Sequence, residues 1–280
     1  YKTMNRTFMK TRQEKLEAFG RILDILDELR VKCPWDREQT TQSLRPQTIE
    51  EVYELSDAIL KDDMKNISKE LGDVLLHVLF YAKIGEEQNE YDIVDVINFL
   101  SDKLIYRHPH VFSSVEVADS AEVVKNWEML KTKEKDGNRR ILSGVPDTLP
   151  PLLKAYRMQD KARGVGFDWE EKSQVWDKVK EEMNEYQAEL DAIEAAESEE
   201  DRAVAFARAE VELGDYLFAV VNAARLYGLN PDTALERTCA KFKRRFTYLE
   251  EHTIRQGRNL KDMTLAEMDE IWDEAKAKGL

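Results

Sequence analysis

An acidic motif that occurs twice is the feature of this sequence most able to carry out chemistry. Residues three apart lie on one face of an α-helix, so each copy predicts two pairs of neighbouring carboxylates. Carboxylates that converge repel one another unless a cation lies between them, and an all-oxygen set favours Mg²⁺, or Mn²⁺, over zinc. The candidate ligands are Glu51, Glu54, Glu70 and Asp73 in the first copy, and Glu182, Glu185, Glu212 and Asp215 in the second.

A pair of basic residues follows each acidic motif. Lys103 and Arg107 are four positions apart, as are Lys241 and Arg245, so each pair projects from one helix face. Such a pair can hold phosphate oxygens directly, while bound cations neutralise others and lower the pKa of a water molecule. Carboxylates followed by a basic pair therefore indicate a site for a metal–polyphosphate substrate. Aromatic side chains that offer a face to a nucleobase are Trp272 and Tyr186.

The elements that position these residues are predicted to be helices, and the fold class is all-α. Apolar residues recur at three- and four-residue spacing in segments 16–30, 74–82 and 217–226. Asn230-Pro231 is typical of a helix start, and Asp168 is expected to precede a helix with glutamates in its first turn. A break from Asp136-Gly137-Asn138 to Pro151 separates the two acidic motifs. We therefore expect tandem helical modules over residues 1–140 and 141–280.

Composition limits the classes of partner. The chain has 280 residues and a formal net charge of −14, which argues against nucleic-acid binding. It contains no run of about 18 apolar residues, so no membrane span is expected, and its first residues lack the apolar region of a secretory signal. Cys33 and Cys239 form no CxxC pair, so we expect free thiols and a cytoplasmic protein.

Taken together, these residues resemble the MazG-type nucleoside triphosphate pyrophosphohydrolases of the all-α NTP pyrophosphatase group. The family motif is Glu-Glu-x-x-Glu, a variable gap, then Glu-x-x-Asp, and both copies match it. The resemblance covers nearly the whole chain after about Leu16. The flanking stretches that share it are Cys33-Pro34-Trp35-Asp36, Arg107-His108-Pro109-His110-Val111-Phe112, Val165-Gly166-Phe167-Asp168-Trp169 and Lys241-Phe242-Lys243-Arg244-Arg245-Phe246.

The resemblance implies two tandem modules of four-helix-bundle type that form a homodimer. It also implies Mg²⁺-dependent hydrolysis of nucleoside triphosphates, ribose or deoxyribose, between the α and β phosphates. In two-domain members the C-terminal module is usually credited with the activity, so Glu182, Glu185, Glu212 and Asp215 would bind the metal. Nucleotide contacts would map onto Lys178, Val179, Lys180, Glu181, Glu182, Ala209, Glu210, Val211, Glu212, Asp215, Lys241, Phe242, Lys243, Arg244, Arg245 and Trp272.

Within that scheme Glu182 and Glu185 serve catalysis through the metal, and Lys241 and Arg245 through the phosphates. Glu181 precedes the ligands and is a candidate to orient water as a base. In the N-terminal copy, Pro109 follows shortly after Arg107 and is expected to end the helix a turn early. The first module therefore lacks a full phosphate clamp, although its metal ligands are intact.

Two other classes of protein could also carry clustered carboxylates. A ferritin-like di-iron protein needs Glu-x-x-His on two helices, and His77 has no counterpart in the second copy. A non-catalytic module could bind metal or nucleotide only to stabilise a dimer, which predicts thermal stabilisation without product. Mid-helix Gly72 and Gly214, which cost about 1 kcal/mol each relative to alanine, indicate either close helix approach or room for a substrate.

Overall fold

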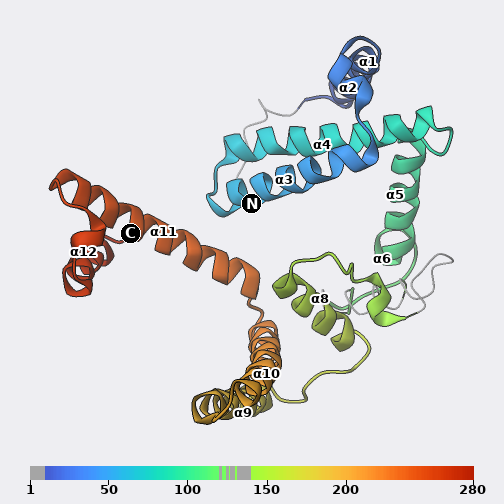
Figure 1. The fold of residues 1–280 in the computed structure, drawn as a ribbon. Helices are drawn as coiled ribbons and strands as arrows, with labels where there is room; N and C mark the ends of the chain where they lie inside the picture. The colour runs from blue at the N-terminus through green and yellow to red at the C-terminus, as the bar shows by residue number, and fades with distance from the viewer. Residues whose placement is uncertain (1–9, 120–121, 124–125, 127–129, 131–139) are drawn as a thin grey trace. The chain divides into compact units, whose positions relative to one another are not determined.

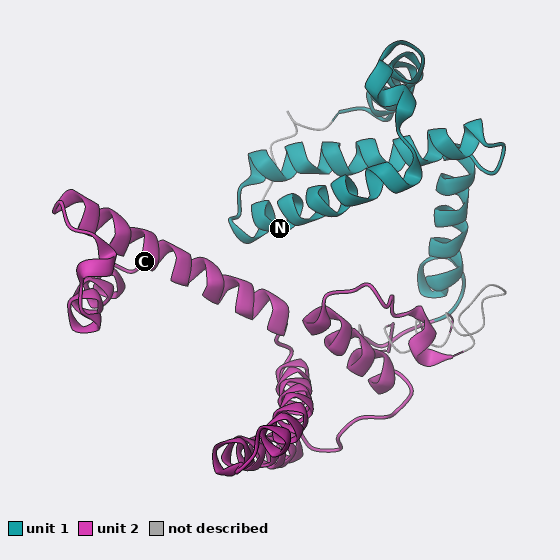
Figure 2. Cartoon of the chain, in the orientation of Figure 1, with its two compact units in different colours: residues 1–115 teal, residues 116–280 magenta. Residues whose placement is uncertain are grey.

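The computed structural model describes residues 10–119, 122–123, 126, 130 and 140–280, and every regular element within them is a helix. The predicted all-α class is confirmed. Two compact units divide the chain, Tyr1–Val115 and Glu116–Leu280 (Figure 2). The predicted break at Asp136-Gly137-Asn138 lies outside the described residues, and a module boundary at 140/141 stays a prediction. None of the described helices combines the length and apolar character that a bilayer span requires.

Unit 1 is built around two long helices that lie side by side, α3 and α4 (Figure 1). Its buried core contains Leu26, Leu44, Leu79, Phe80 and Ile84, so helices α1, α3 and α4 share one apolar interior. Hydroxyl side chains cap two helices, since Thr11 and Thr40 each accept a backbone N–H of the first turn. The helices are α1 (Arg12–Lys32), α2 (Pro34–Glu38), α3 (Thr41–Leu60), α4 (Met64–Glu87), α5 (Ile93–Arg107) and α6 (Pro109–Phe112).

Unit 2 has two separate apolar cores. Val175, Val179, Ala219 and Ala223 join α9 to α10, which pack along each other. A second cluster of Leu249, Met263 and Ile271 joins α11 to α12. The elements are η2 (Ile141–Gly144), α8 (Pro151–Arg163), α9 (Gln174–Ala195), α10 (Glu199–Leu226), α11 (Pro231–Arg255), η3 (Leu260–Asp262) and α12 (Leu265–Ala277).

The ends of helices α5 and α11 test the sequence predictions. Asn230 caps α11 by accepting the N–H of Thr233, with Pro231 in the first turn, as expected. Helix α5 ends at Arg107, whereas α11 continues ten residues beyond Arg245. The early stop before Pro109 is therefore confirmed, and the two basic pairs lie on helices of different length.

The expected helix directly after Asp168 is wrong. Helix α9 begins only at Gln174, and Glu170 and Glu171 belong to the preceding loop instead of a first helical turn. The Asp168 carboxylate accepts hydrogen bonds from the guanidinium of Arg225, 57 residues further along the chain. This distant partner, which sequence periodicity does not reveal, holds the segment as a loop.

Candidate metal centres

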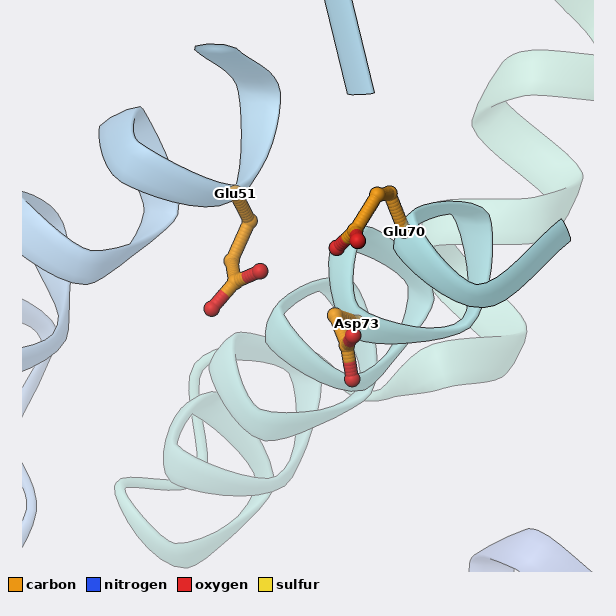
Figure 3. A group of neighbouring side chains, drawn as sticks. All are labelled: Glu51, Glu70 and Asp73. Carbon is orange, nitrogen blue, oxygen red and sulfur yellow. The ribbon is translucent and has the colours of Figure 1, made fainter. Parts of the chain in front are cut away.

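The first carboxylate cluster lies where α3 and α4 pack together. Glu51 extends from α3, and Glu70 and Asp73 extend from α4 one turn apart (Figure 3). One carboxylate oxygen from each of the three lies within 4.8 Å of the other two. The i,i+3 spacing of the motif and the packing of the two helices thus bring together three of the four predicted ligands.

Burial makes this cluster electrostatically costly without a cation. Glu70 is 2% exposed, and within the described part of the chain its Oε2 atom has no hydrogen-bond partner. Its Oε1 atom accepts from the Lys69 ammonium at 3.1 Å. Partial burial, followed by the charges of Asp73, Glu54 and Glu70, raises the pKa of Glu51 above its ordinary value. A buried carboxylate oxygen without a partner fits a bound cation, because burying an uncompensated charge is unfavourable.

The second cluster repeats this arrangement between α9 and α10. Oxygens of Glu182, Glu212 and Asp215 lie within 4.8 Å of one another, and Glu182 is buried. The Lys178 ammonium donates to Glu182 at 2.6 Å and to Glu181 at 2.8 Å, and these bonds raise the pKa of Lys178. A positive charge therefore already lies against the carboxylates, as the repulsion argument requires.

Glu54 and Glu185, the fourth predicted ligand of each set, lie beside these trios and are not part of them. Glu54 lines an open cavity of about 640 Å³ together with Glu70 and four other unit 1 residues. Partial desolvation and the charges of Glu182, Glu181 and Glu212 raise the pKa of Glu185. Glu54 and Glu185 thus lie close enough to interact electrostatically with the trios. Their role as ligands stays a prediction.

A largely apolar cavity of about 630 Å³ adjoins the second cluster. Glu182, Asp215 and Lys178 lie on its wall, so the carboxylates open directly onto it. The remaining wall comes from η2, α8, α10 and the loop before α9, and includes Met158, Gln159, Phe167, Trp169, Phe218 and Asn222. Its volume falls within the usual range of about 300–1,000 Å³ for small-molecule sites.

A buried ion pair fixes the loop that closes this cavity. Arg225 donates to both oxygens of Asp168 and twice to Oδ1 of Asn222. The Arg225 side chain is 5% exposed, so the pair is well shielded from water. Asp168 thereby sets the positions of its neighbours Phe167 and Trp169. The sequence pattern around Phe167-Asp168-Trp169 predicts a helix start at Asp168 and gives no sign of this ion pair.

The predicted phosphate clamp on α11 lies elsewhere in unit 2. Arg245 donates to the carbonyl oxygen of Leu280 at 2.7 Å, and its guanidinium lies 5.9 Å from the ring centre of Trp272. The Trp272 ring also packs against Phe242 at 5.1 Å. Exposed side chains on the same helix are those of Lys241, Lys243 and Arg244. No α11 or α12 residue is among the cavity-lining residues described for unit 2, so contact between clamp and carboxylates stays a prediction.

The other predicted nucleotide contacts divide by burial. Val179 belongs to the α9–α10 core and Ala209 is buried, so both support the helices that carry the carboxylates. Lys180, Glu210 and Val211 are exposed. Gln159 and Asn222 line the cavity but were absent from the sequence prediction.

Neither carboxylate trio includes a histidine among the described residues. The ring of His77 is buried, its Nδ1 lies 3.0 Å from the Thr48 hydroxyl, and burial lowers its pKa. His77 therefore belongs to a hydrogen-bonded group with Thr48 and Tyr81. This placement gives no support to the di-iron alternative.

Comparison with known proteins defines the class. A family model described as MazG nucleotide pyrophosphohydrolase domain matches residues 39–112, which include the whole first carboxylate cluster. The nucleoside triphosphate pyrophosphohydrolase of Escherichia coli is 38% identical over 93% of this chain and 98% of its own length. A Thermotoga maritima protein named nucleoside triphosphate pyrophosphohydrolase/pyrophosphatase MazG is 38% identical over 92% and 95%. The uncharacterised YabN of Bacillus subtilis is 46% identical over 95% of this chain and 53% of its own length.

The helical fold and the two carboxylate clusters of this motif agree with that class of nucleotide hydrolase. The chain belongs to the MazG family of nucleotide pyrophosphohydrolases, and it is an enzyme of that family.

Proposed function

We propose that the protein hydrolyses nucleoside triphosphates, with ribose or deoxyribose, between the α and β phosphates, giving a nucleoside monophosphate and pyrophosphate. The observation that carries this proposal is the trio of Glu182, Glu212 and Asp215, two of which line a large apolar cavity. Charged ligands for a cation and a shielded apolar space for a base thus adjoin each other. The names of the E. coli and T. maritima relatives support the same reaction.

Mg²⁺ is the proposed cofactor, with Mn²⁺ as a substitute. The donors in both clusters are carboxylate oxygens, which suit a hard cation. The buried Glu70 oxygen without a partner, and the lysines that lie against both clusters, fit sites that require positive charge. When bound, such an ion neutralises phosphate oxygens and lowers the pKa of water.

The residues of unit 2 have distinct proposed roles. Glu182, Glu185, Glu212 and Asp215 hold the cation, and Glu181 orients the attacking water and accepts its proton. Glu181 is exposed and bonded to Lys178, so substrate binding that draws Lys178 towards phosphate would release it for this role. Lys241 and Arg245 hold the departing pyrophosphate, for which Arg245 exchanges the Leu280 carbonyl for a phosphate oxygen.

We further propose a cytoplasmic homodimer with a module boundary near residue 140. Large apolar side chains remain exposed on the helices of each unit, including Phe99 on α5, which is 65% exposed. Exposed apolar side chains in such number support a protein interface. The charge of −14 gives no support to nucleic acid as the partner, so a second copy of the chain is the proposed occupant.

Product analysis tests the proposed reaction. The protein is incubated with Mg²⁺ and each common triphosphate, and the products are separated by anion exchange. Monophosphate plus pyrophosphate supports cleavage at the α–β bond. Diphosphate plus orthophosphate would refute it, and nucleotide-induced thermal stabilisation without any product would favour the non-catalytic module.

A further inference from the structure

We propose that the cavity of unit 2 is the base subsite of the enzyme and that Gln159 reads the base through its amide oxygen. This inference rests on the proposed function, because it assigns the place of the base within the same nucleotide. It differs from the sequence prediction, which offered Trp272 and Tyr186 as aromatic faces for the base.

The side-chain amide of Gln159 uses its nitrogen in a hydrogen bond, while its oxygen accepts none from the described residues. The side chain is 7% exposed and lies on α8 at the cavity wall. Its Nε2 atom donates to the carbonyl oxygen of Phe218 on α10 at 2.8 Å, which fixes the orientation of the amide. Its Oε1 atom is buried and has no hydrogen-bond partner among the residues that the structure describes. A buried acceptor without a partner costs about 1–3 kcal/mol, so a ligand N–H at this position is favoured.

Asn222 supplies the complementary group on the same wall. Its Oδ1 atom accepts from Nε of Arg225 at 3.1 Å and from Nη2 at 2.8 Å. The oxygen is therefore engaged, and the Nδ2 amide donates to no residue within the described part of the chain. Gln159 and Asn222, which both line the cavity, thus carry one acceptor and one donor without partners among the described residues. The pairing edge of a nucleobase can satisfy such a pair.

The loop before α9 supplies the flat surfaces that a base requires. Phe167 and Trp169 both line the cavity and flank Asp168, which Arg225 fixes in place. Stacking on an aromatic ring contributes about 1–3 kcal/mol per base and tolerates every base. Glu182 and Asp215 share this wall, so a base in the cavity leaves the phosphates to reach the carboxylates.

Unit 1 provides a contrast within the same chain. The seventh residue after the aspartate of the motif is Phe80 in unit 1 and Asn222 in unit 2. Phe80 is buried in the apolar core with Leu26 and Leu79, whereas Asn222 lines the cavity. At this position of the repeat, unit 1 has an apolar core side chain, whereas unit 2 has a polar amide on the cavity wall.

Every common base carries an N–H group on its pairing edge, so the Gln159 acceptor admits them all and rejects a base that lacks the group. Purine riboside triphosphate lacks it, and it differs from ATP only by the absence of the amino group. We expect the wild-type enzyme to prefer ATP in kcat/KM by roughly tenfold or more. In Gln159→Met this preference should fall to near one. Gln187→Met on α9, a matched change at an exposed glutamine outside the cavity wall, should retain it.

The ratio of the two substrates separates base reading from a structural role. If Gln159 only supports α8, its replacement lowers kcat/KM for both triphosphates by the same factor, and the proposal is overturned. Thermal stabilisation by the same two triphosphates is measured in parallel. If the triphosphates stabilise the protein through Gln159 but no turnover occurs, the proposed reaction is refuted and the base subsite is supported. Turnover with the same ATP preference in Gln159→Met as in the wild type would refute the base subsite alone. The absence of both turnover and thermal stabilisation would overturn both the reaction and the subsite.

Discussion

Glu51 and Glu185 show what crowding does to single carboxylates. Each has a raised pKa, for which partial desolvation is the first cause and neighbouring carboxylates the next. Because the folded protein holds these protons more tightly than the unfolded chain, stability is favoured at acidic pH and lost as pH rises through the raised values. A cation bound as proposed would reverse this preference, since its carboxylate ligands must be ionised.

The expected result is a pH dependence of opposite sign with and without metal. As pH falls from about 8 towards the ordinary glutamate range near 4.3, the rise in melting temperature caused by Mg²⁺ should shrink. The metal-free protein should gain stability from these two groups over the same interval. Thermal melts with Mg²⁺ and with EDTA measure both trends, and Glu51→Gln should flatten the part due to unit 1. An Mg²⁺ effect that is constant down to pH 5 would contradict this account of the two glutamates.

At the scale of the elements, Gly85 shows a helix position fixed by a close contact. A Cβ atom at Gly85 would lie 2.8 Å from the backbone oxygen of Tyr91 and 2.7 Å from its ring. Gly20 on α1 has nothing within 4 Å of the same position. Gly85→Ala should therefore destabilise the protein by about 1–3 kcal/mol through overpacking. Gly20→Ala should stabilise it by about 0.5–1 kcal/mol, the normal gain in a helix.

Urea unfolding followed by circular dichroism compares the two glycine variants. Equal effects of the same sign would show that the turn at Tyr91 does not restrict the end of α4. Gly72 and Gly214 also have open space beside them. A Cβ atom at either position would have no described atom within 4 Å, apart from its chain neighbours and the backbone of its own helix. Of the two reasons expected from sequence, close helix approach therefore finds no support within either unit.

The loop before α9 depends on one ion pair that joins distant parts of unit 2. Asp168→Ala leaves the guanidinium of Arg225 buried without its carboxylate, a change that typically costs about 3–5 kcal/mol. We expect unit 2 to unfold at lower urea concentration by a corresponding amount. Asp168→Asn should cost less, because an amide oxygen still accepts one hydrogen bond. If Asp168→Ala unfolds at the wild-type midpoint, the ion pair does not anchor the loop.

The helices and the carboxylate trios were predictable from sequence because both depend on local spacing. The three-residue intervals of Glu70 to Asp73 and Glu212 to Asp215 set a common face whatever the tertiary fold. The loop at Asp168 and the cavity acceptor on Gln159 were not predictable. Their partners Arg225 and Phe218 lie 57 and 59 residues away, so no local pattern reports them.

At the scale of the whole molecule, the chain carries the same acidic motif in two units with different surroundings. In unit 1 the early end of α5 and the burial of Phe80 accompany an open cavity that is lined largely by acidic residues and includes Glu70. In unit 2 a long α11 and the polar Asn222 accompany an apolar cavity beside Glu182. These differences support a division in which unit 2 performs catalysis and unit 1 binds metal without full contacts to the substrate.

The measurement that tests this division most directly compares Glu182→Gln with Glu51→Gln in Mg²⁺-dependent release of pyrophosphate. The two variants make the same chemical change at matching positions of the two motifs. Glu182→Gln should lower kcat/KM on the order of 100-fold or more, because the metal loses a buried ligand, while Glu51→Gln should retain most of the activity. Activity lost with Glu51→Gln and kept with Glu182→Gln would contradict the assignment of catalysis to unit 2.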